Sequence, residues 1–336
     1  MDAEKQLEAD SRYMRRALRL AEYGAGHASP NPMVGAVIVA RGRVIGEGWH
    51  RRCGGPHAEV NAVRSVSPDD ERLLPESTIY VTLEPCSHYG KTPPCSLLLI
   101  EKGIPRIVIG TEDPFAKVSG RGIRMLREAG REVVTGVLRR ECRDLNRRFI
   151  TAHTLGRPWI QLKWAQTADR IMGATEGAGR LVISNPATMQ LMHRERAMAD
   201  AILVGTGTVI ADNPSLTTRL WPGSDARPAG FDSPRLPADS RIMQRQPLLK
   251  RPDETLGDFL HRLYAEEGIT SLMVEGGAAT LQSFLETGLY DEIRVETAPR
   301  NAGGGIPAPE IPAGIPLEES LTIRGNRIDT YRRQQC

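Results

Sequence analysis

The sequence lacks features that mark several classes of protein. No apolar run is long enough to cross a membrane, and Met1 to Asp10 is polar and acidic rather than a signal region. Its 44 Lys and Arg against 41 Asp and Glu leave a net charge of only +3, too mild to indicate a nucleic-acid partner. The five cysteines are widely spaced and odd in number, which argues against a disulfide framework. We therefore expect a cytoplasmic protein that binds neither membranes nor nucleic acids.

Aromatic residues are also few, at 5%, whereas 24 Pro and 33 Gly indicate many sharp loops without reaching the range of disordered chains. A length of 336 residues predicts two domains. The break Leu155-Gly156-Arg157-Pro158 places the boundary near 145–157. We assign residues 1–150 to the first domain and 151–336 to the second.

Strands and helices alternate in both halves, which predicts α/β domains with largely parallel sheets. In such sheets ligands bind at the carboxyl ends of strands. A single basic helix is expected over Leu138 to Thr151, and Asn185 is a plausible N-cap for a helix over Pro186 to Met198. Residues 221–254 are rich in proline and contain no convincing strand, so we expect a long irregular segment there.

One constellation has the spacing of a catalytic metal site. His57 is followed two residues later by Glu59, and Cys86 and Cys95 flank an eight-residue spacer after an expected strand. Zinc bound by one His and two Cys keeps a fourth position open for water and lowers the pKa of that water, so that hydroxide is available. Glu59 is placed to move the proton from the water to a leaving amine. The alternative is a structural zinc site closed by a fourth ligand such as Cys53.

The arrangement resembles zinc-dependent nucleobase deaminases, whose signature is His-x-Glu followed by Pro-Cys-x-x-Cys. In this chain the spacer between the two Cys is longer than in that signature. Together with Ser29-Pro30-Asn31-Pro32 and Thr82-Leu83-Glu84-Pro85-Cys86, it resembles the motifs of the pyrimidine deaminase domain of riboflavin biosynthesis. Asp200 to Gly205, Thr208 to Arg219 and Val274-Glu275-Gly276-Gly277 resemble the reductase domain that bifunctional members carry. This resemblance implies a cytidine-deaminase-like three-layer α/β domain followed by a dihydrofolate-reductase-like α/β domain.

The resemblance also implies residue roles in the first domain. One Zn²⁺ per chain is held by His57, Cys86 and Cys95, with Glu59 as the proton shuttle. The substrate is a diaminopyrimidinone with a phosphoribosyl group, 2,5-diamino-6-(5-phosphoribosylamino)pyrimidin-4(3H)-one. The positions that match substrate contacts are Asn31, His50, Lys91 and Asp113.

For the second domain the resemblance implies NADPH-dependent reduction of the ribosyl group to a ribityl chain, with Asp212 as a sensible proton donor. Positions that match cofactor contacts are Thr167, Ser184, Thr208, Asp212, Gly276 and Gly277. Positions that match substrate contacts are Arg196, Leu216, Arg219 and Glu275.

The chain departs from the family pattern at three places. Phe115 follows Asp113-Pro114 where the family has Asn, and Arg170 stands where the family has Gly in an early turn of the reductase. Arg227 to Arg235, with Pro and Gly, replaces an apolar strand, so we expect a smaller sheet or an open cofactor pocket.

Alternatives to the bifunctional enzyme remain open on the sequence. The second domain could be a degenerate scaffold that forms oligomers, or the zinc could stabilise a binding module without catalysis. A tRNA or nucleoside deaminase is disfavoured by the near-neutral charge and the long cysteine spacer. We expect a homo-oligomer, because two-domain chains of this family tend to associate.

Overall fold

The computed structural model describes residues 3–89, 93–114, 120–175, 179 and 181–333. It divides into two compact units, Met1–Leu155 and Gly156–Cys336, whereas the boundary assigned from the sequence, between residues 150 and 151, lies inside helix α6 (Arg147–Leu155). Within the described ranges, no helix has the length and apolar character needed to cross a membrane.

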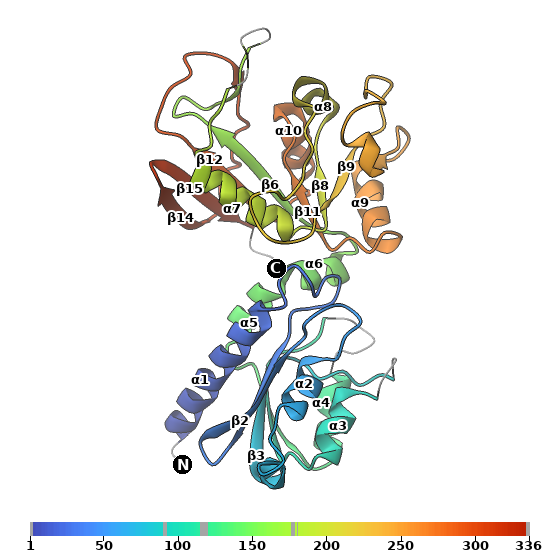
Figure 1. Ribbon diagram of the computed structural model, residues 1–336, viewed down its shortest axis with the longest axis vertical. Helices are drawn as coiled ribbons and strands as arrows, with labels where there is room; N and C mark the ends of the chain where they lie inside the picture. Colours follow the sequence, from blue (N-terminus) through green and yellow to red (C-terminus); the bar gives the residue numbers. More distant parts are fainter. Residues whose placement is uncertain (1–2, 90–92, 115–119, 176–178, 180, 334–336) are drawn as a thin grey trace. The chain divides into compact units, whose positions relative to one another are not determined.

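The first unit has one five-stranded sheet with helices on both sides (Figure 1). Its strands are β1 (Gly35–Ala40), β2 (Arg43–Trp49), β3 (Ser77–Leu83), β4 (Arg106–Thr111) and β5 (Glu132–Thr135). Its helices are α1 (Ala3–Glu22), α2 (Ala58–Arg64), the 3-10 helix η1 (Glu71–Glu76), α3 (Cys95–Glu101), α4 (Arg121–Glu128), α5 (Arg139–Leu145) and α6.

The strand order of this sheet is β2-β1-β3-β4-β5. β3, β4 and β5 are parallel, but β1 is antiparallel to both β2 and β3. The expectation of a largely parallel sheet therefore holds for four of the five strands, which run in the same direction, and β1 is the exception. The tight turn at Arg41-Gly42 forces β2 to return beside β1 as a hairpin, and β1 then meets β3 in the opposite direction.

Side chains that alternate along the strands build two cores, one on each face of the sheet. Ile38, Ile79 and Ile107 belong to a buried cluster that also contains residues of α2, α3 and α4. Val39, Tyr80 and Val108 belong to a second cluster with residues of α1 and α5. The first unit is thus a three-layer sandwich, with α2, α3 and α4 on the face that carries the candidate metal ligands (Figure 1).

The expected basic helix over Leu138 to Thr151 is two helices, which is a correction to the sequence interpretation. α5 ends at Leu145, and α6 begins at Arg147. Asn146 lies between them in a non-helical conformation and is 2% exposed. The break could not be predicted from the sequence, because one polar residue does not interrupt the helical periodicity of apolar residues on either side of it.

The second unit is built on an eight-stranded sheet, which forms the centre of that unit in Figure 1. A separate two-stranded ribbon accompanies it. Its strands are β6 (Trp159–Gln166), β7 (Ile171–Gly173), β8 (Ala201–Leu203), β9 (Arg227–Phe231), β10 (Leu248–Lys250), β11 (Ser271–Val274), β12 (Glu292–Thr297), β13 (Ile306–Pro307), β14 (Leu317–Ile323) and β15 (Asn326–Arg332). Its helices are α7 (Pro186–Ala197), α8 (Thr206–Asp212), the 3-10 helix η2 (Met243–Arg245), α9 (Leu256–Ala265) and α10 (Ala278–Thr287).

The large sheet has the order β10-β9-β8-β11-β6-β12-β15-β14 and is parallel from β10 to β12. Phe259 of α9 and Phe284 of α10 pack with Ile160, Leu162 and Val274 in the main apolar core on one face. The opposite face, under α7, carries charged side chains. The expected N-cap of α7 is confirmed, since Asn185 Oδ1 accepts hydrogen bonds from the backbone of Ala187 and Thr188.

The expectation of a reduced sheet in residues 221–254 is wrong. β9 lies inside the sheet, parallel to both β8 and β10, although it contains Pro228 and Gly230. The N–H of Arg227 donates to the carbonyl of Asp200, and the carbonyl of Ala229 accepts from the N–H of Val204, so both residues bond toward β8. The backbone nitrogen of Pro228, which has no N–H, therefore faces the β10 edge. β10 begins only opposite Ala229, so no ladder bond from Pro228 is missing.

Elements near the C-terminus and in two loops had no counterpart in the sequence interpretation. The β14–β15 hairpin, the β7–β13 ribbon and α8 are present in the structure but were not predicted. β14 is exposed along almost its whole length, so it does not show the alternation of buried and exposed residues from which strands are inferred.

Candidate active sites

The three predicted zinc ligands come together in the first unit. His57 precedes α2, Cys86 follows β3 and Cys95 is the first residue of α3. His57 Nδ1 lies 3.5 Å from Cys86 Sγ and 3.4 Å from Cys95 Sγ, and all three ligand atoms lie within 4.8 Å of one another. Tetrahedral zinc with ordinary Zn–N and Zn–S bonds needs N···S separations of about 3.6 Å. The donor set and its spacing therefore fit zinc.

Cys53 does not join this group. It is exposed, and among the residues that the structure describes the metal-ligating cluster consists of His57, Cys86 and Cys95. A structural zinc site is usually closed by four nitrogen or sulfur ligands. The three-residue set instead corresponds to a site with an open coordination position.

Electrostatic contacts within the triad favour one thiolate. The hydrogen bond from the Cys95 thiol, followed by that from His57, lowers the pKa of Cys86 to about 4. The hydrogen bond to Cys86 raises the pKa of His57 to about 9. The backbone N–H of Cys95 also donates to Cys86 Sγ over 3.2 Å, which supports negative charge on that sulfur.

Glu59 lies in the first turn of α2 and is 3% exposed. Burial, reinforced by the charge of Cys86, raises the pKa of Glu59 to about 7. α2 packs directly on β2 at Gly48, where a Cβ atom would lie 2.3 Å from the backbone nitrogen of Ala62. This close approach holds the turn with Glu59 against the sheet, beside the triad.

Asn31 and His50 also reach this site. His50 Nδ1 lies 3.1 Å from the carbonyl oxygen of Pro56, and its Nε2 lies 3.1 Å from Asn31 Nδ2. Burial lowers the pKa of His50, so the ring is neutral, with Nδ1 as donor to Pro56 and Nε2 as acceptor from Asn31. The His50 ring stands edge-on to the His57 ring at 5.6 Å between centroids. The structure thus brings two predicted substrate contacts beside the ligands.

Asp113 follows β4 and is half-buried, and its backbone N–H donates to Glu84 Oε2 over 3.3 Å. Lys91 and Phe115 lie outside the described residues. Glu84 is a residue whose importance the sequence reasoning missed. Its two oxygens accept four backbone hydrogen bonds, from Asp113, Gly120, Gly122 and Ile123.

No signal in the sequence marks Glu84, because the partners of its carboxylate are backbone N–H groups. The turn after Glu84 meets α4 at Gly122, where a Cβ atom would lie 2.1 Å from the carbonyl oxygen of Pro85. Glu84 and Gly122 together fix the loop that carries Cys86 against the start of α4.

In the second unit, Arg196 of α7 and Glu275 after β11 form a buried ion pair. Arg196 Nε and Nη2 lie 2.9 and 2.6 Å from the two carboxylate oxygens, and Nη1 donates to the carbonyl of Thr217. Both side chains are 10% exposed. Burial alone would raise the pKa of Glu275, but Arg196 holds it below its ordinary value. Both residues are expected from the sequence as substrate contacts, and the structure pairs them with each other.

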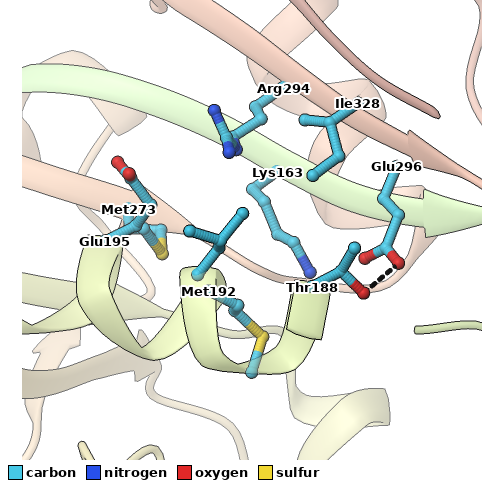
Figure 2. Close-up of a pocket in the computed structure, with 9 residues that line it drawn as sticks. Lys163, Thr188, Met192, Glu195, Met273, Arg294, Glu296 and Ile328 are labelled. Atoms are coloured by element: carbon cyan, nitrogen blue, oxygen red, sulfur yellow. Dashed lines mark hydrogen bonds between the residues drawn. The ribbon is translucent and has the colours of Figure 1, made fainter. Parts of the chain in front are cut away.

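Lys163 of β6 is a second residue that the sequence reasoning missed. Figure 2 shows it on the sheet face under α7, with Arg294 and Glu296 of β12 and with Met192 and Glu195 of α7. These side chains line a cavity of about 10 Å³, enough for one water molecule. Burial lowers the pKa of Lys163, while the charges of Glu275 and Glu296 oppose that shift. A lysine inside the apolar strand Trp159 to Trp164 was the signal in the sequence.

Ser184, a predicted cofactor contact, donates to Glu296 Oε2 over 2.6 Å. Glu296 Oε1 accepts from Thr188 Oγ1 at 2.6 Å and from Asn326 Nδ2 at 2.5 Å (Figure 2 marks the Thr188 bond). Glu296 is 3% exposed. This buried carboxylate therefore holds the start of α7 to β12 and β15, with Lys163 close by.

Thr208, Gly276 and Gly277 lie together at the carboxyl ends of β8 and β11, which are adjacent parallel strands. The N–H of Gly277 donates to Thr208 Oγ1 over 3.0 Å, and a Cβ atom on Gly276 would lie 2.7 Å from Thr280. Gly277 is the N-cap of α10. Backbone N–H groups at such a glycine turn and helix start suit a phosphate, so these residues fit a dinucleotide.

The remaining predicted residues of the second unit differ in their exposure to solvent. Thr167 is fully buried, and its hydroxyl bonds Asp169 Oδ1 and the backbone of Ile171, which closes the turn that contains Arg170. Arg170 has φ +62°, so it adopts the left-handed conformation that Gly would favour. Leu216 is buried, whereas Asp212 at the end of α8 and Arg219 are exposed.

The turn at Thr167 adjoins a wide cavity. Asp169 accepts hydrogen bonds from the backbone of Ala302 and Gly303. These two residues, together with Thr175 and Arg300, line an open cavity of about 530 Å³. The second unit therefore has an enclosed charged pocket under α7 and a larger open one beside this turn.

Comparisons with known proteins agree with this geometry. Residues 7–111 match the family described as "Cytidine and deoxycytidylate deaminase zinc-binding region", and residues 158–333 match "RibD C-terminal domain". The chain is 38% identical to "Riboflavin biosynthesis protein RibD" of Aquifex aeolicus (strain VF5) over 96% of each chain. It is 34% identical to the protein of the same name from Escherichia coli (strain K12), over 88% of this chain and 89% of that protein.

Two solved structures resemble the whole chain. Acinetobacter baumannii RibD, form 1, gives a TM-score of 0.90 at 30% identity and covers 98% of this chain and 100% of that chain. A diaminohydroxyphosphoribosylaminopyrimidine deaminase/5-amino-6-(5-phosphoribosylamino)uracil reductase from Thermotoga maritima gives 0.88 at 34%, covering 97% and 99%. The predicted fold class, a cytidine-deaminase-like unit followed by a dihydrofolate-reductase-like α/β unit, is confirmed.

Proposed function

The chain belongs to the RibD family and is a bifunctional deaminase and reductase of riboflavin biosynthesis, and from this premise we propose which substrate, cofactors and residues serve each reaction. Residues 1–150 form the zinc-dependent pyrimidine deaminase, and residues 151–336 form the NADPH-dependent reductase. The two family matches support two active enzymes over a deaminase with a degenerate scaffold, and over a binding module without catalysis.

The deaminase acts on 2,5-diamino-6-(5-phosphoribosylamino)pyrimidin-4(3H)-one and releases ammonia. One zinc ion, held by His57, Cys86 and Cys95, supplies an activated water when bound. The observation that supports this reaction is the triad of ligand atoms within 4.8 Å with the buried Glu59 beside it. The eight-residue cysteine spacer distinguishes the site from the shorter spacing of other zinc deaminases.

Glu59 takes a proton from the attacking water and gives a proton to the departing amino group. A pKa of about 7, caused by burial, suits a carboxyl group that must both accept and donate near neutral pH. Asn31 and His50 bind polar atoms of the pyrimidine ring, because both lie beside the triad and carry hydrogen-bonding groups. Asp113 and Lys91 complete the substrate site in this proposal.

Ammonia release from the diaminopyrimidine substrate by the purified full chain tests the deaminase. We expect activity with zinc at one ion per chain, and a loss of at least about 100-fold in Glu59→Gln with zinc retained. Full ammonia release by that variant would contradict the proton-shuttle role. Zinc binding without ammonia release by the wild-type chain would contradict the deaminase proposal as a whole.

The reductase converts the ribosyl group of the deaminated product to a ribityl chain. NADPH supplies the hydride when bound. Gly276, Gly277 and Thr208 hold its phosphates, because they lie at the carboxyl ends of the parallel strands β8 and β11 and Gly277 is the N-cap of α10. Thr167 and Ser184 belong to the same cofactor site in this proposal, and Asp212 donates the proton. The exposure of Asp212 allows it to exchange protons with solvent.

The Arg196–Glu275 pair, Leu216 and Arg219 form the substrate side of the reductase. Lys163 joins them, since the charges of Glu275 and Glu296 act on it and it lines the pocket under α7. NADPH oxidation by the full chain, started with the deaminated product, tests this assignment. Absence of both NADPH binding and oxidation would contradict the reductase, while leaving the deaminase intact.

We also propose that the protein acts on small molecules in the cytoplasm as a homo-oligomer. Its small net charge supports the exclusion of nucleic acids. Light scattering of the purified chain measures the assembly state, and a mass of one chain at micromolar concentration would contradict the oligomer.

A further inference from the structure

Asn146 is a buried polar residue that none of the proposed chemistry uses. It is 2% exposed and lies at the break between α5 and α6. Its backbone N–H donates to the carbonyl of Arg143 over 3.1 Å, and its own carbonyl accepts from Ile150 over 2.8 Å. The side-chain amide takes no part in the hydrogen bonds of either helix. It bonds to a segment more than a hundred residues earlier in the chain.

That segment contains Met33. The N–H of Met33 donates to Asn146 Oδ1 over 2.8 Å, and Asn146 Nδ2 donates to the carbonyl of Met33 over 2.8 Å. One side-chain amide thus pairs with both polar groups of one backbone residue, as a neighbouring strand would. Met33 precedes β1, which begins at Gly35, so the sheet ladder does not hold it.

The held segment leads directly to the deaminase site. Asn31, two residues before Met33, contacts His50 Nε2 at 3.1 Å, and the carbonyl of Val34 accepts from the N–H of His50 over 2.9 Å. The segment from Asn31 to Val34 is therefore fixed on one side by Asn146 and on the other by His50. A movement of Met33 would move the Asn31 amide relative to the His50 ring.

We propose that Asn146 is a positioning residue for the deaminase reaction: it clamps the backbone of Met33 so that Asn31 stays in place beside the substrate ring. This inference rests on the proposed role of Asn31 as a substrate contact. Asn146 itself touches neither the substrate site nor the metal ligands in its hydrogen bonds.

The shape of the clamp makes asparagine specific at this position. Aspartate has nearly the same shape but cannot donate to the carbonyl of Met33, and alanine leaves both groups of Met33 without this partner. Arg143 lies three residues earlier on α5 and is exposed, so Arg143→Ala is a matched control on the same helix.

The test uses the full chain with Asn146→Asp, Asn146→Ala and Arg143→Ala. We expect both Asn146 variants to raise the deaminase KM roughly tenfold with a smaller change in kcat, because a substrate contact is misplaced while Glu59 and the ligands stay in place. Zinc content, the rate of NADPH oxidation and all values for Arg143→Ala should remain as in the wild type. An unchanged KM in both Asn146 variants overturns the proposal.

A merely structural role gives a different result. If both Asn146 variants lose zinc or reductase activity together with deaminase activity, Asn146 stabilises the chain as a whole and the proposal is overturned. Substrate binding in a Glu59→Gln background gives a second readout that does not need turnover. The dissociation constant of the diaminopyrimidine substrate should rise by the same factor as the KM.

Asn31→Ala, alone and with Asn146→Ala, separates this inference from the proposed function. If Asn146 acts through Asn31, the double variant has the KM of Asn31→Ala, because the Asn31 amide that Asn146→Ala would displace is already absent. Additive effects overturn the clamp. An unchanged KM in Asn31→Ala alone contradicts the substrate role of Asn31, whereas a raised KM there with an unchanged KM in Asn146→Ala contradicts only the role of Asn146.

Discussion

The two units hold their chemically active groups in different ways. In the first unit, the candidate metal ligands lie at the ends of separate elements, and two of them, His57 and Cys86, remain partly accessible. In the second unit, Arg196 of α7 pairs with Glu275, and the negative charges of Glu275 and Glu296 act on Lys163 of β6. The first site is organised to receive an ion, and the second already neutralises its own charges.

This difference affects what a single substitution removes. Losing a ligand in the first unit removes a cofactor and leaves the fold largely in place, since the two apolar cores lie elsewhere. Losing one charge in the second unit leaves another buried charge without its partner, which costs stability as well as activity. The comparison therefore predicts that activity and stability separate in the first unit and fall together in the second.

The largest expected effect concerns the metal ligand Cys95. Cys95→Ala should reduce bound zinc from one ion per chain to none and abolish ammonia release, because two protein ligands hold zinc poorly. NADPH oxidation should persist. Metal analysis and the two activity assays on one preparation measure this, and Cys53→Ala, an exposed thiol outside the cluster, serves as the control. Retained zinc in Cys95→Ala would contradict the three-ligand site.

The next effect concerns Lys163. Lys163→Met keeps the length of the side chain but removes its charge and donors, so NADPH oxidation should fall about 100-fold while ammonia release stays constant. Lys250→Met, on β10 of the same unit, is the control and should leave both rates unchanged. A reductase rate within a factor of two of the wild type would exclude Lys163 from the site.

The buried pair in the second unit should also matter for stability. Arg196→Met leaves the carboxylate of Glu275 buried without its partner and should lower the free energy of unfolding of that unit by about 3–5 kcal/mol. Arg196→Met with Glu275→Leu should recover most of this loss. Arg16–Glu47, an exposed pair of the first unit, should contribute less than about 1 kcal/mol when Arg16 is replaced by Ala.

Urea denaturation followed by separate probes of the two units measures these differences. Trp159 and Trp164 report on the second unit, and Trp49 reports on the first. Equal losses for the buried and the exposed pair would show that the two units do not differ in this respect.

The smallest effect is a dependence of stability on pH in the first unit. Burial alone would raise the pKa of Asp10, but hydrogen bonds from Arg106, Gln6 and Tyr80 hold it below its ordinary value. Because the folded pKa is depressed, this stabilisation is present above the unfolded pKa of about 4 and is lost as pH falls through the folded pKa. Thermal unfolding between pH 6 and pH 3 measures it, and Asp10→Asn should flatten the dependence.

Much of the deaminase site could be predicted from the sequence, because its residues are close together along the chain and their types are specific. His57, Glu59 and Cys86 lie within thirty residues, and the spacing of ligands restricts the possible metals. Glu84 was missed because its partners are backbone N–H groups, which carry no residue-specific signal. Asn146 was missed for the same reason, since its partner is the backbone of Met33.

The reductase site was predicted less completely. Arg196 and Glu275 were both expected as substrate contacts, and their pairing with each other depends on how α7 packs against β11. Lys163 is one polar residue in an apolar strand, and only the sheet order shows that it faces α7 with Glu296. β9 was dismissed because proline disfavours central strands, whereas the direction of its backbone groups makes Pro228 harmless.

The sequence by itself indicated the candidate zinc ligands, the acid beside them, two domains and the family, because these depend on residue types and their spacing along the chain. Tertiary structure alone decided which charges are paired, where Lys163 and Glu296 meet, and that Asn146 holds the segment of Asn31. Those contacts join residues far apart in the chain, and their energies come from burial and from backbone partners that no local pattern records.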